Sequence, residues 1–196
     1  MLPLAMAKRR ATPAVNLPKR ATPLADVPRR VERVTLDDHL EIMTRAIFQA
    51  GLSWAFIAAR WDAFRAAFEN FAIARVADYG AFDIDRLLHT EGIVHSRKKL
   101  AGTVENAKTL VQVERTFGSV SAYIAGFNTY RQLLADIRGR FVFMGDLSSY
   151  YWLFRTGNAV PVFDDWIAAQ SSDHPRMREM VLTGRAEGTS TERADY

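Results

Sequence analysis

Two short stretches carry the groups best suited to chemistry in this sequence. Residues 160–166 read VPVFDDW and place two adjacent carboxylates, Asp164 and Asp165, between a proline and a tryptophan. A fixed carboxylate can stabilise a developing positive charge or orient an attacking water. An aspartate is also a common helix N-cap, so Asp164 could serve as the cap and leave Asp165 free.

The second stretch, QAGLSW at 49–54, lies between two apolar stripes of helical spacing. Gly51 permits a sharp turn, and Ser53 is a suitable N-cap. We therefore expect two core helices joined by a turn with Gln49 and Leu52 at its tip. From the residues alone, an ordinary helix corner with Leu52 in the core is the simpler interpretation. The stripes are Leu36, Leu40, Met43 and Ile47, then Trp54, Ile57, Trp61, Phe64 and Phe68.

Metal and redox sites are excluded by residue type and spacing. The chain has no cysteine, which rules out disulfides, thiolate zinc sites and cysteine-held iron–sulfur clusters. We expect the protein to act without a metal or other cofactor. The four histidines do not have convincing ligand spacing: His39, His89, His95 and His174.

The charge of the chain is concentrated at its start. Residues 1–33 hold eight Lys and Arg against two acidic residues, a net of +6, whereas the 196-residue chain carries +4, so residues 34–196 carry −2. Five prolines forbid a continuous helix there, and we expect a flexible basic arm. The body itself does not have the charge of a basic nucleic-acid binder.

The periodicity predicts an all-α protein. We expect a helical domain over 34–183 and a disordered tail over 184–196, with no span across a membrane and no secretory signal. The absence of cysteine suits the reducing cytoplasm, and we expect the protein to act there as a monomer. Thr35 and Asp38 have the form of a capping box. Gly139 and Gly157 are expected to end helices. The expected helices cover about 36–49, 53–69, 73–79, 83–90, 95–115, 119–127 and 129–138, one through Leu147 and Phe154, and one starting near Asp164.

These motifs together resemble the DNA-3-methyladenine glycosylase I family of the helix-hairpin-helix DNA glycosylases, which excise damaged bases. The resemblance covers roughly residues 35 to 166. It implies a two-lobed helical fold and a base-excision activity on double-stranded DNA that contains damaged bases. It is carried by QAGLSW (49–54), FRAAF (64–68), DRLL (85–88), GIVHSRKKL (92–100), ENA (105–107) and FGS (117–119). FMGDLSSYY (143–151) resembles the hairpin of the superfamily, and VPVFDDW (160–166) resembles the segment with the superfamily's aspartate, as in the alkyladenine glycosylases, which glycosylase I lacks.

The resemblance also implies roles for single residues. Leu52 would be the apolar wedge that fills the space of a flipped base, with Gly51 in its turn and Gln49 facing the orphaned base. Asp165 would take the catalytic position. Trp54, Tyr150 and Tyr151 would be candidates to stack on the flipped base, although aromatic residues at helical spacing are more often core. A phosphate-binding hairpin would comprise Met144, Gly145, Leu147 and Ser148.

Three features distinguish this chain from other members of the family or of the wider superfamily. The pocket glutamate of the family falls at Ala46, which indicates a changed base specificity or a loss of activity. The cysteines of the family's zinc site are missing. The position that carries a Schiff-base lysine in strand-cleaving relatives is Ser149, which favours a monofunctional glycosylase.

Two alternatives remain open from the sequence. The chain could be a non-catalytic helix-hairpin-helix relative that binds DNA without excision, which Ala46 and the acidic body favour. It could also be a helical protein that binds no DNA. The basic residues His95, Arg97, Lys98 and Lys99 fit either phosphate contacts or a solvated basic face.

Overall fold

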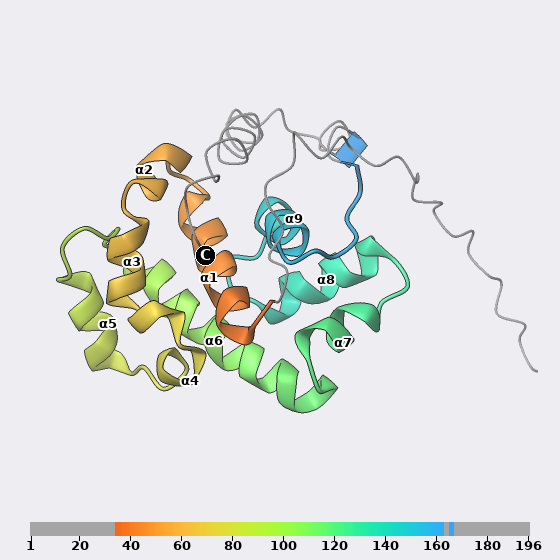
Figure 1. Ribbon diagram of the computed structural model, residues 1–196, viewed down its shortest axis with the longest axis horizontal. Helices are drawn as coiled ribbons and strands as arrows, with labels where there is room; N and C mark the ends of the chain where they lie inside the picture. The colour runs from red at the N-terminus through yellow and green to blue at the C-terminus, as the bar shows by residue number, and fades with distance from the viewer. Residues whose placement is uncertain (1–33, 163–164, 167–196) are drawn as a thin grey trace, which may run out of the picture.

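Helix α1 (Leu36–Gln49) lies at the centre of the structure (Figure 1). It begins with the expected capping box, in which the Asp38 backbone N–H donates to Thr35 Oγ1 over 3.2 Å and the Thr35 N–H donates to the Asp38 carboxylate over 2.7 Å. Three residues of its apolar stripe are buried, with Leu40 and Met43 at 0% and Ile47 at 1% exposure, and Leu36 at its start is half-buried. The predicted bounds of this helix are confirmed.

The computed structural model describes residues 34–162 and 165–166, and the regular elements of that part of the chain are all helices, as predicted. The basic arm, the tail and most of the helix expected near Asp164 lie outside the described residues. After α1 follow α2 (Trp54–Ala58), α3 (Trp61–Ala67), the 3-10 helix η2 (Glu69–Phe71), α4 (Ile73–Val76), α5 (Ala81–Leu88), α6 (Arg97–Phe117), α7 (Val120–Ala125), α8 (Tyr130–Arg140) and α9 (Asp146–Arg155).

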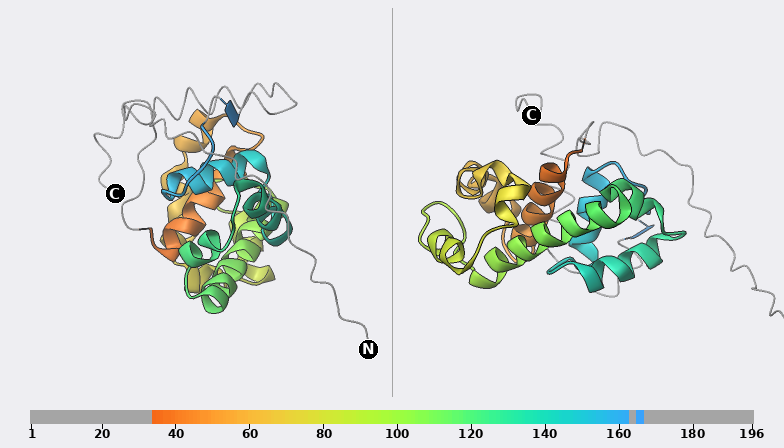
Figure 2. Two further views of the ribbon diagram at one scale, coloured as in Figure 1. Left: turned by 90° about the vertical axis from the view of Figure 1, so that its right-hand side faces the viewer. Right: turned by 90° about the horizontal axis from the view of Figure 1, so that it is seen from below.

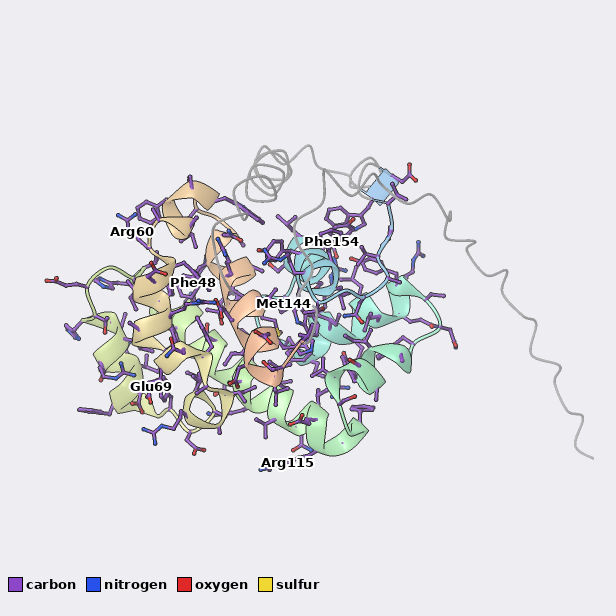
Figure 3. All side chains as sticks on the ribbon, viewed as in Figure 1. Phe48, Arg60, Glu69, Arg115, Met144 and Phe154 are labelled. Carbon is purple, nitrogen blue, oxygen red and sulfur yellow. The ribbon has the colours of Figure 1, made fainter. Side chains whose placement is uncertain are left out.

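The long helix α6 runs along the molecule and connects its two ends (Figure 2). It contacts α1, α4 and α5 as well as α7, and α1 contacts α9. Two predicted boundaries are confirmed here, since Gly118 ends α6 with a left-handed backbone and Ser119 caps α7. Figure 3 shows Phe48 and Met144 in the interior, whereas Arg60 and Arg115 lie at the periphery. The core is therefore continuous from α3 to α9.

The single helix predicted over 53–69 is wrong, because the chain breaks at Arg60. The Arg60 guanidinium folds back over the Phe56 ring at 3.6 Å, and its Nη1 donates to the Phe56 carbonyl over 3.3 Å. The Arg60 N–H bonds instead to the Ile57 carbonyl over 3.0 Å. Because α2 and α3 keep the same buried stripe, the apolar period does not reveal the break.

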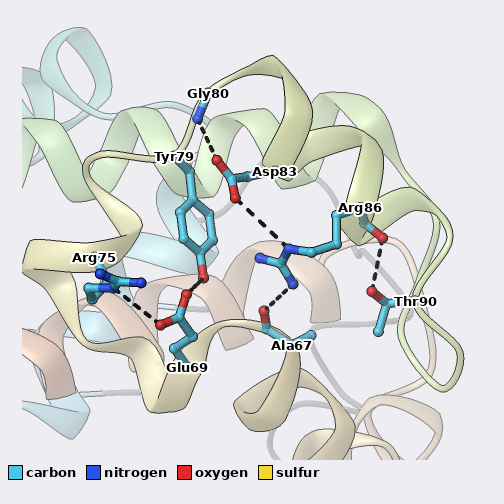
Figure 4. A network of polar contacts seen from close by, with 8 residues as sticks. All are labelled: Ala67, Glu69, Arg75, Tyr79, Gly80, Asp83, Arg86 and Thr90. Carbon is cyan, nitrogen blue, oxygen red and sulfur yellow. Dashed lines mark hydrogen bonds and ion pairs between the residues drawn. The ribbon is translucent and has the colours of Figure 1, made fainter.

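A left-handed turn that the pattern does not predict follows α3. Glu69, Asn70 and Phe71 all have positive φ, a conformation disfavoured for side chains other than glycine. Phe71 is fully buried against aromatic neighbours, and Glu69 accepts from the Tyr79 hydroxyl over 2.9 Å and pairs with Arg75 (Figure 4). The burial of the Phe71 ring and the polar contacts of Glu69 together stabilise this strained backbone conformation.

The expectation that Gly139 ends a helix is also wrong, since α8 continues to Arg140. Arg140 pairs with Asp136 one turn earlier through two hydrogen bonds of 2.8 and 3.1 Å. A glycine inside a helix costs only about 1 kcal/mol, which such a pair on the last turn helps to offset.

A buried hydrogen bond joins α1 to α9. The Trp152 indole N–H donates to His39 Nδ1 over 3.0 Å, and the two rings meet edge to face. His39 is 4% exposed, and burial lowers its pKa from the ordinary value of 6.5 to about 4, against a smaller opposing effect of Asp38. A neutral imidazole is thus built into the contact between the two helices.

A second buried bond positions the turn before α9. Asn106 of α6 is 0% exposed, and its amide donates to the Val142 carbonyl over 2.9 Å and accepts from the Val142 N–H over 2.7 Å. Phe143 has a positive φ of 61° and lies over Gly102, where an added Cβ would stand 2.8 Å from the Phe143 ring. Asn106 and Gly102 together seat this turn on α6.

Acid should destabilise the protein through His39. The folded state disfavours the charged imidazole, so this contribution is complete above pH 6.5 and is lost as the pH falls toward 4. We expect it to reach at most about 3 kcal/mol. Urea unfolding of wild type and His39→Gln between pH 7 and 4 measures the difference, and parallel pH profiles would contradict the prediction.

Removal of the Asn106 amide should lower the free energy of unfolding far more than the loss of a small side chain would. Asn106→Ala leaves the Val142 N–H and carbonyl without their partner, at about 1–3 kcal/mol for each group that stays buried. The free energy of unfolding in urea should therefore fall by about 2–4 kcal/mol. Gln112→Ala, at an exposed position of the same helix, is the matched control. An equal small loss in both variants would show that Asn106 does not hold the turn.

Candidate functional site

The turn between α1 and α2 has the geometry expected from its residues. Gly51 takes a φ of 102°, in the left-handed region that favours glycine. Ser53 caps α2 by accepting from the Phe56 N–H over 3.3 Å. The Leu52 N–H donates to the Gln49 carbonyl over 3.3 Å and closes the turn. The predicted turn with a glycine and a serine cap is therefore confirmed.

Lys99 ties this turn to the start of α6. Its ammonium donates to the Ala50 carbonyl over 2.6 Å and lies 5.6 Å from the centre of the Phe48 ring. A cation at the carbonyl end of α1 also complements the helix dipole. Lys99 and Ala50 are 49 residues apart, so local patterns do not predict this contact. Leu52, in the same turn, is half-buried and packs against the core.

Gln49 and Ala46 line the last turn of α1 from the inside. Gln49 is 1% exposed and Ala46 4% exposed. Neither the nitrogen nor the oxygen of the Gln49 amide has a hydrogen-bond partner within the described chain. Each such buried polar atom costs about 1–3 kcal/mol. The amide expected to face an orphaned base thus lies inside the DNA-free protein, away from the tip of the turn.

Two of the three aromatic candidates are brought together. Trp54 and Tyr151 meet edge to face with 5.2 Å between ring centres and join α2 to α9. Both are buried, at 2% and 5% exposure, and the Arg155 guanidinium donates to the Tyr151 hydroxyl over 2.8 Å. This ring pair follows directly on the turn that carries Leu52.

Tyr150 lies in a different cluster. Its ring stacks on Trp166 with 4.3 Å between centres, and its hydroxyl donates to the Pro161 carbonyl over 2.9 Å. The backbone N–H of Trp166 donates to the Val162 carbonyl over 2.8 Å. Tyr150 therefore holds both ends of the 161–166 segment against α9. Asp165, between these contacts, is exposed.

The hairpin differs in detail from a glycine-driven turn. Gly145 is the N-cap of α9 and has a negative φ of −74°, and an added Cβ there would meet nothing within 4 Å. The left-handed residue is Phe143 instead. Met144 is buried at 2% exposure, and its carbonyl accepts from the Ser149 hydroxyl over 3.2 Å.

The N-terminus of α9 has features that suit an anion. Within the described part of the chain, no side chain caps it. Asp146, whose carboxylate would repel a phosphate, pairs with Arg138 of α8. Leu147 is half-buried and Ser148 is 5% exposed. Arg138 was not singled out in the sequence, because a pair across two helices leaves no local pattern.

The basic residues at the start of α6 are partly used within the protein. Arg97 pairs with Asp85, and His95 Nε2 lies 2.8 Å from the Thr90 carbonyl. The residues of this chain do not fit the zinc site expected from the family resemblance. The chain has no cysteine, and its described part holds no cluster of three side chains that could bind a metal. No helix within the described ranges is long and apolar enough to cross a membrane.

The folded part is similar to known DNA repair proteins. Residues 33–142 match the model of the methyladenine glycosylase family. The chain is 32% identical over 89 residues to the DNA-3-methyladenine glycosylase of Haemophilus influenzae, and this covers 45% of the chain and 48% of the relative. It is 34% identical over 67 residues to DNA-3-methyladenine glycosylase 1 of Escherichia coli K12, which covers 34% and 36%. The chain thus spans about half the length, or less, of these relatives.

A solved structure extends the likeness to the fold. The structure that describes 3-methyladenine recognition by 3-methyladenine DNA glycosylase I of Staphylococcus aureus aligns with a TM-score of 0.59 at 26% identity and covers 68% of this chain and 82% of that one. Because the family model matches more than half of the sequence, the chain belongs to the methyladenine glycosylase family.

Proposed function

We propose that this chain is a monofunctional DNA glycosylase of base excision repair, which flips a damaged base out of duplex DNA and hydrolyses its N-glycosidic bond. The observation that carries the proposal is the turn at 49–53, which Lys99 ties to α6 beside the buried Trp54–Tyr151 pair. Family membership and the names of the relatives support it. As part of the proposal, the enzyme has the two-lobed helix-hairpin-helix arrangement and acts as a monomer without metal.

Leu52 and the ring pair would handle the flipped base. A base inside the duplex is unreachable, and its extrusion costs a few kcal/mol. Leu52 would fill the vacated space, and Gly51 gives its turn the required shape. Trp54 and Tyr151 would supply the apolar wall on which the base stacks, because they follow the wedge in sequence and lie together in space.

The hairpin would bind the phosphate backbone without reading sequence. No side chain among the described residues caps the first backbone N–H groups of α9, and the helix dipole favours an anion there. Ser148 and Leu147 belong to this first turn, and Met144 anchors it in the core. Arg138 offsets the charge of Asp146, which removes the main electrostatic objection to a phosphate at this end.

Asp165 would supply the negative charge that the reaction needs. Cleavage of an N-glycosidic bond builds positive charge on the sugar, which a fixed carboxylate stabilises while it orients the attacking water. Tyr150 and Trp166 would keep this carboxylate in place. Ser149 is buried and offers no amine, so strand cleavage through a Schiff base is not part of the proposal.

A non-catalytic DNA-binding relative is the second candidate. The observation that favours it is Ala46, a buried methyl group at the position of the family's pocket glutamate. Release of a base from lesion-bearing duplexes separates the two candidates. Salt-dependent binding to an abasic duplex separates both from a protein that binds no DNA.

Truncation of the wedge should weaken DNA binding more than stability. Leu52→Ala should lower the affinity for an abasic duplex by about tenfold or more, since the wedge offsets part of the cost of flipping. Because Leu52 is half-buried, we expect a loss of only about 1 kcal/mol in unfolding free energy. Phe82→Ala, at a site 81% exposed on α5, is the control. A large stability loss with unchanged DNA affinity would assign Leu52 to the core.

Removal of the Asp165 charge should abolish most of the chemistry. Asp165→Asn should lower the single-turnover release of a neutral lesion by about two orders of magnitude or more. Binding to an abasic duplex should persist or strengthen, because a carboxylate near phosphates is repulsive. Asp164→Asn should alter mainly stability, by up to about 1 kcal/mol if that residue is a cap. Full excision by Asp165→Asn would remove Asp165 from the mechanism.

A further inference from the structure

The amide of Gln49 is buried, yet the protein does not satisfy it. The side chain is 1% exposed, and within the described residues both its donor and its acceptor lack a partner. Buried polar atoms are nearly always hydrogen-bonded, so an exception calls for a physical reason. A buried side chain whose donor and acceptor both lack a partner is expected where a ligand supplies both hydrogen bonds.

The position of Gln49 places this amide near the proposed base pocket. The face of α1 that carries His39 lies against Trp152 of α9. Ala46 lies seven residues, or two turns, after His39 and therefore on the same face. Gln49 follows Ala46 by one turn. The next residues of the chain are the wedge turn and Trp54, whose ring meets Tyr151 of α9. The amide thus lies where α1, α2 and α9 converge.

The carboxylates of α1 are all occupied elsewhere. Asp37 accepts from the Ile73 N–H over 2.8 Å, and Asp38 belongs to the capping box. Glu41 accepts from the Trp61 indole over 2.6 Å and pairs with Arg65. Helix α1 therefore presents a neutral amide and the methyl group of Ala46 at its end, with no carboxylate to favour a cationic base.

We propose that Gln49 selects neutral bases with a lactam edge, in which an N–H and a carbonyl stand side by side, as in hypoxanthine. The Gln49 amide N–H donates to the base carbonyl, and its oxygen accepts from the base N–H, so one planar pair satisfies both atoms. Normal guanine shares this edge, but extrusion of a correctly paired base costs more than that of a mispaired one. This inference rests on the proposed function and names its substrate class.

The first test measures how the Gln49 amide affects thermal stability and the binding of a free base, without any catalytic step. Gln49→Met keeps the length of the side chain and removes both hydrogen-bonding groups, and Gln132→Met at an exposed position of α8 is the matched control. Without ligand, Gln49→Met should melt at the same or a higher temperature, because an unmet polar group is removed. Free hypoxanthine should bind wild type and the control in calorimetry, and Gln49→Met at least about tenfold more weakly. A lower melting temperature for Gln49→Met, with hypoxanthine binding unchanged, would overturn the inference.

The second test compares single-turnover release from hypoxanthine and 3-methyladenine duplexes. Gln49→Met should reduce hypoxanthine release by about 10- to 100-fold, since a site built for hydrogen bonds loses selectivity without them. Release of cationic 3-methyladenine should change little, and Gln49→Glu should shift the preference toward it. Equal losses for both bases would contradict the inference. Wild type that releases 3-methyladenine but not hypoxanthine would leave the proposed function standing and refute this inference. Gln49-dependent hypoxanthine binding without any base release would support this inference and refute the proposed glycosylase activity.

Discussion

The paired hydrogen bonds between Asn106 and Val142 determine where the functional elements stand. They fix the turn before α9 on the middle of α6, while Lys99, two turns earlier on α6, holds the turn after α1. The wedge turn and the hairpin thus take their separation from one helix. Because an α-helix is stiff and rises 1.5 Å per residue, α6 acts as a spacer between the two parts that we propose contact DNA.

The contact between α1 and α9 complements this spacer. His39 of α1 and Trp152 of α9 meet through a buried bond to a neutral imidazole, and the neighbouring Tyr151 of α9 packs against Trp54 of α2. Two polar anchors on α6 and one between α1 and α9 therefore surround the region where Gln49 ends α1. Under the proposed function, a base that enters this region would meet groups whose positions are already fixed, which is the condition for selective hydrogen bonding.

Much of the fold could be predicted from the sequence, because its caps and turns depend on residues that are close together in the chain. The box of Thr35 and Asp38, the positive φ of Gly51 and the cap of Ser53 follow from neighbours in sequence, and so did the all-α class. The break at Arg60 escaped because a side chain competes for the Phe56 carbonyl without any change in apolar period. The burial of Gln49, the Lys99 tie and the separate cluster of Tyr150 depend on contacts distant in sequence, which a single sequence does not display.

The central place of α1 also has a consequence in time. His39 and its partner Trp152 are 113 residues apart, so during synthesis α1 leaves the ribosome long before α9 exists. At about 5–20 residues per second, the delay is about 6–23 s, far longer than a helix needs to form. Throughout this interval the α9-facing side of α1 is uncovered, and its apolar side chains are open to chaperones.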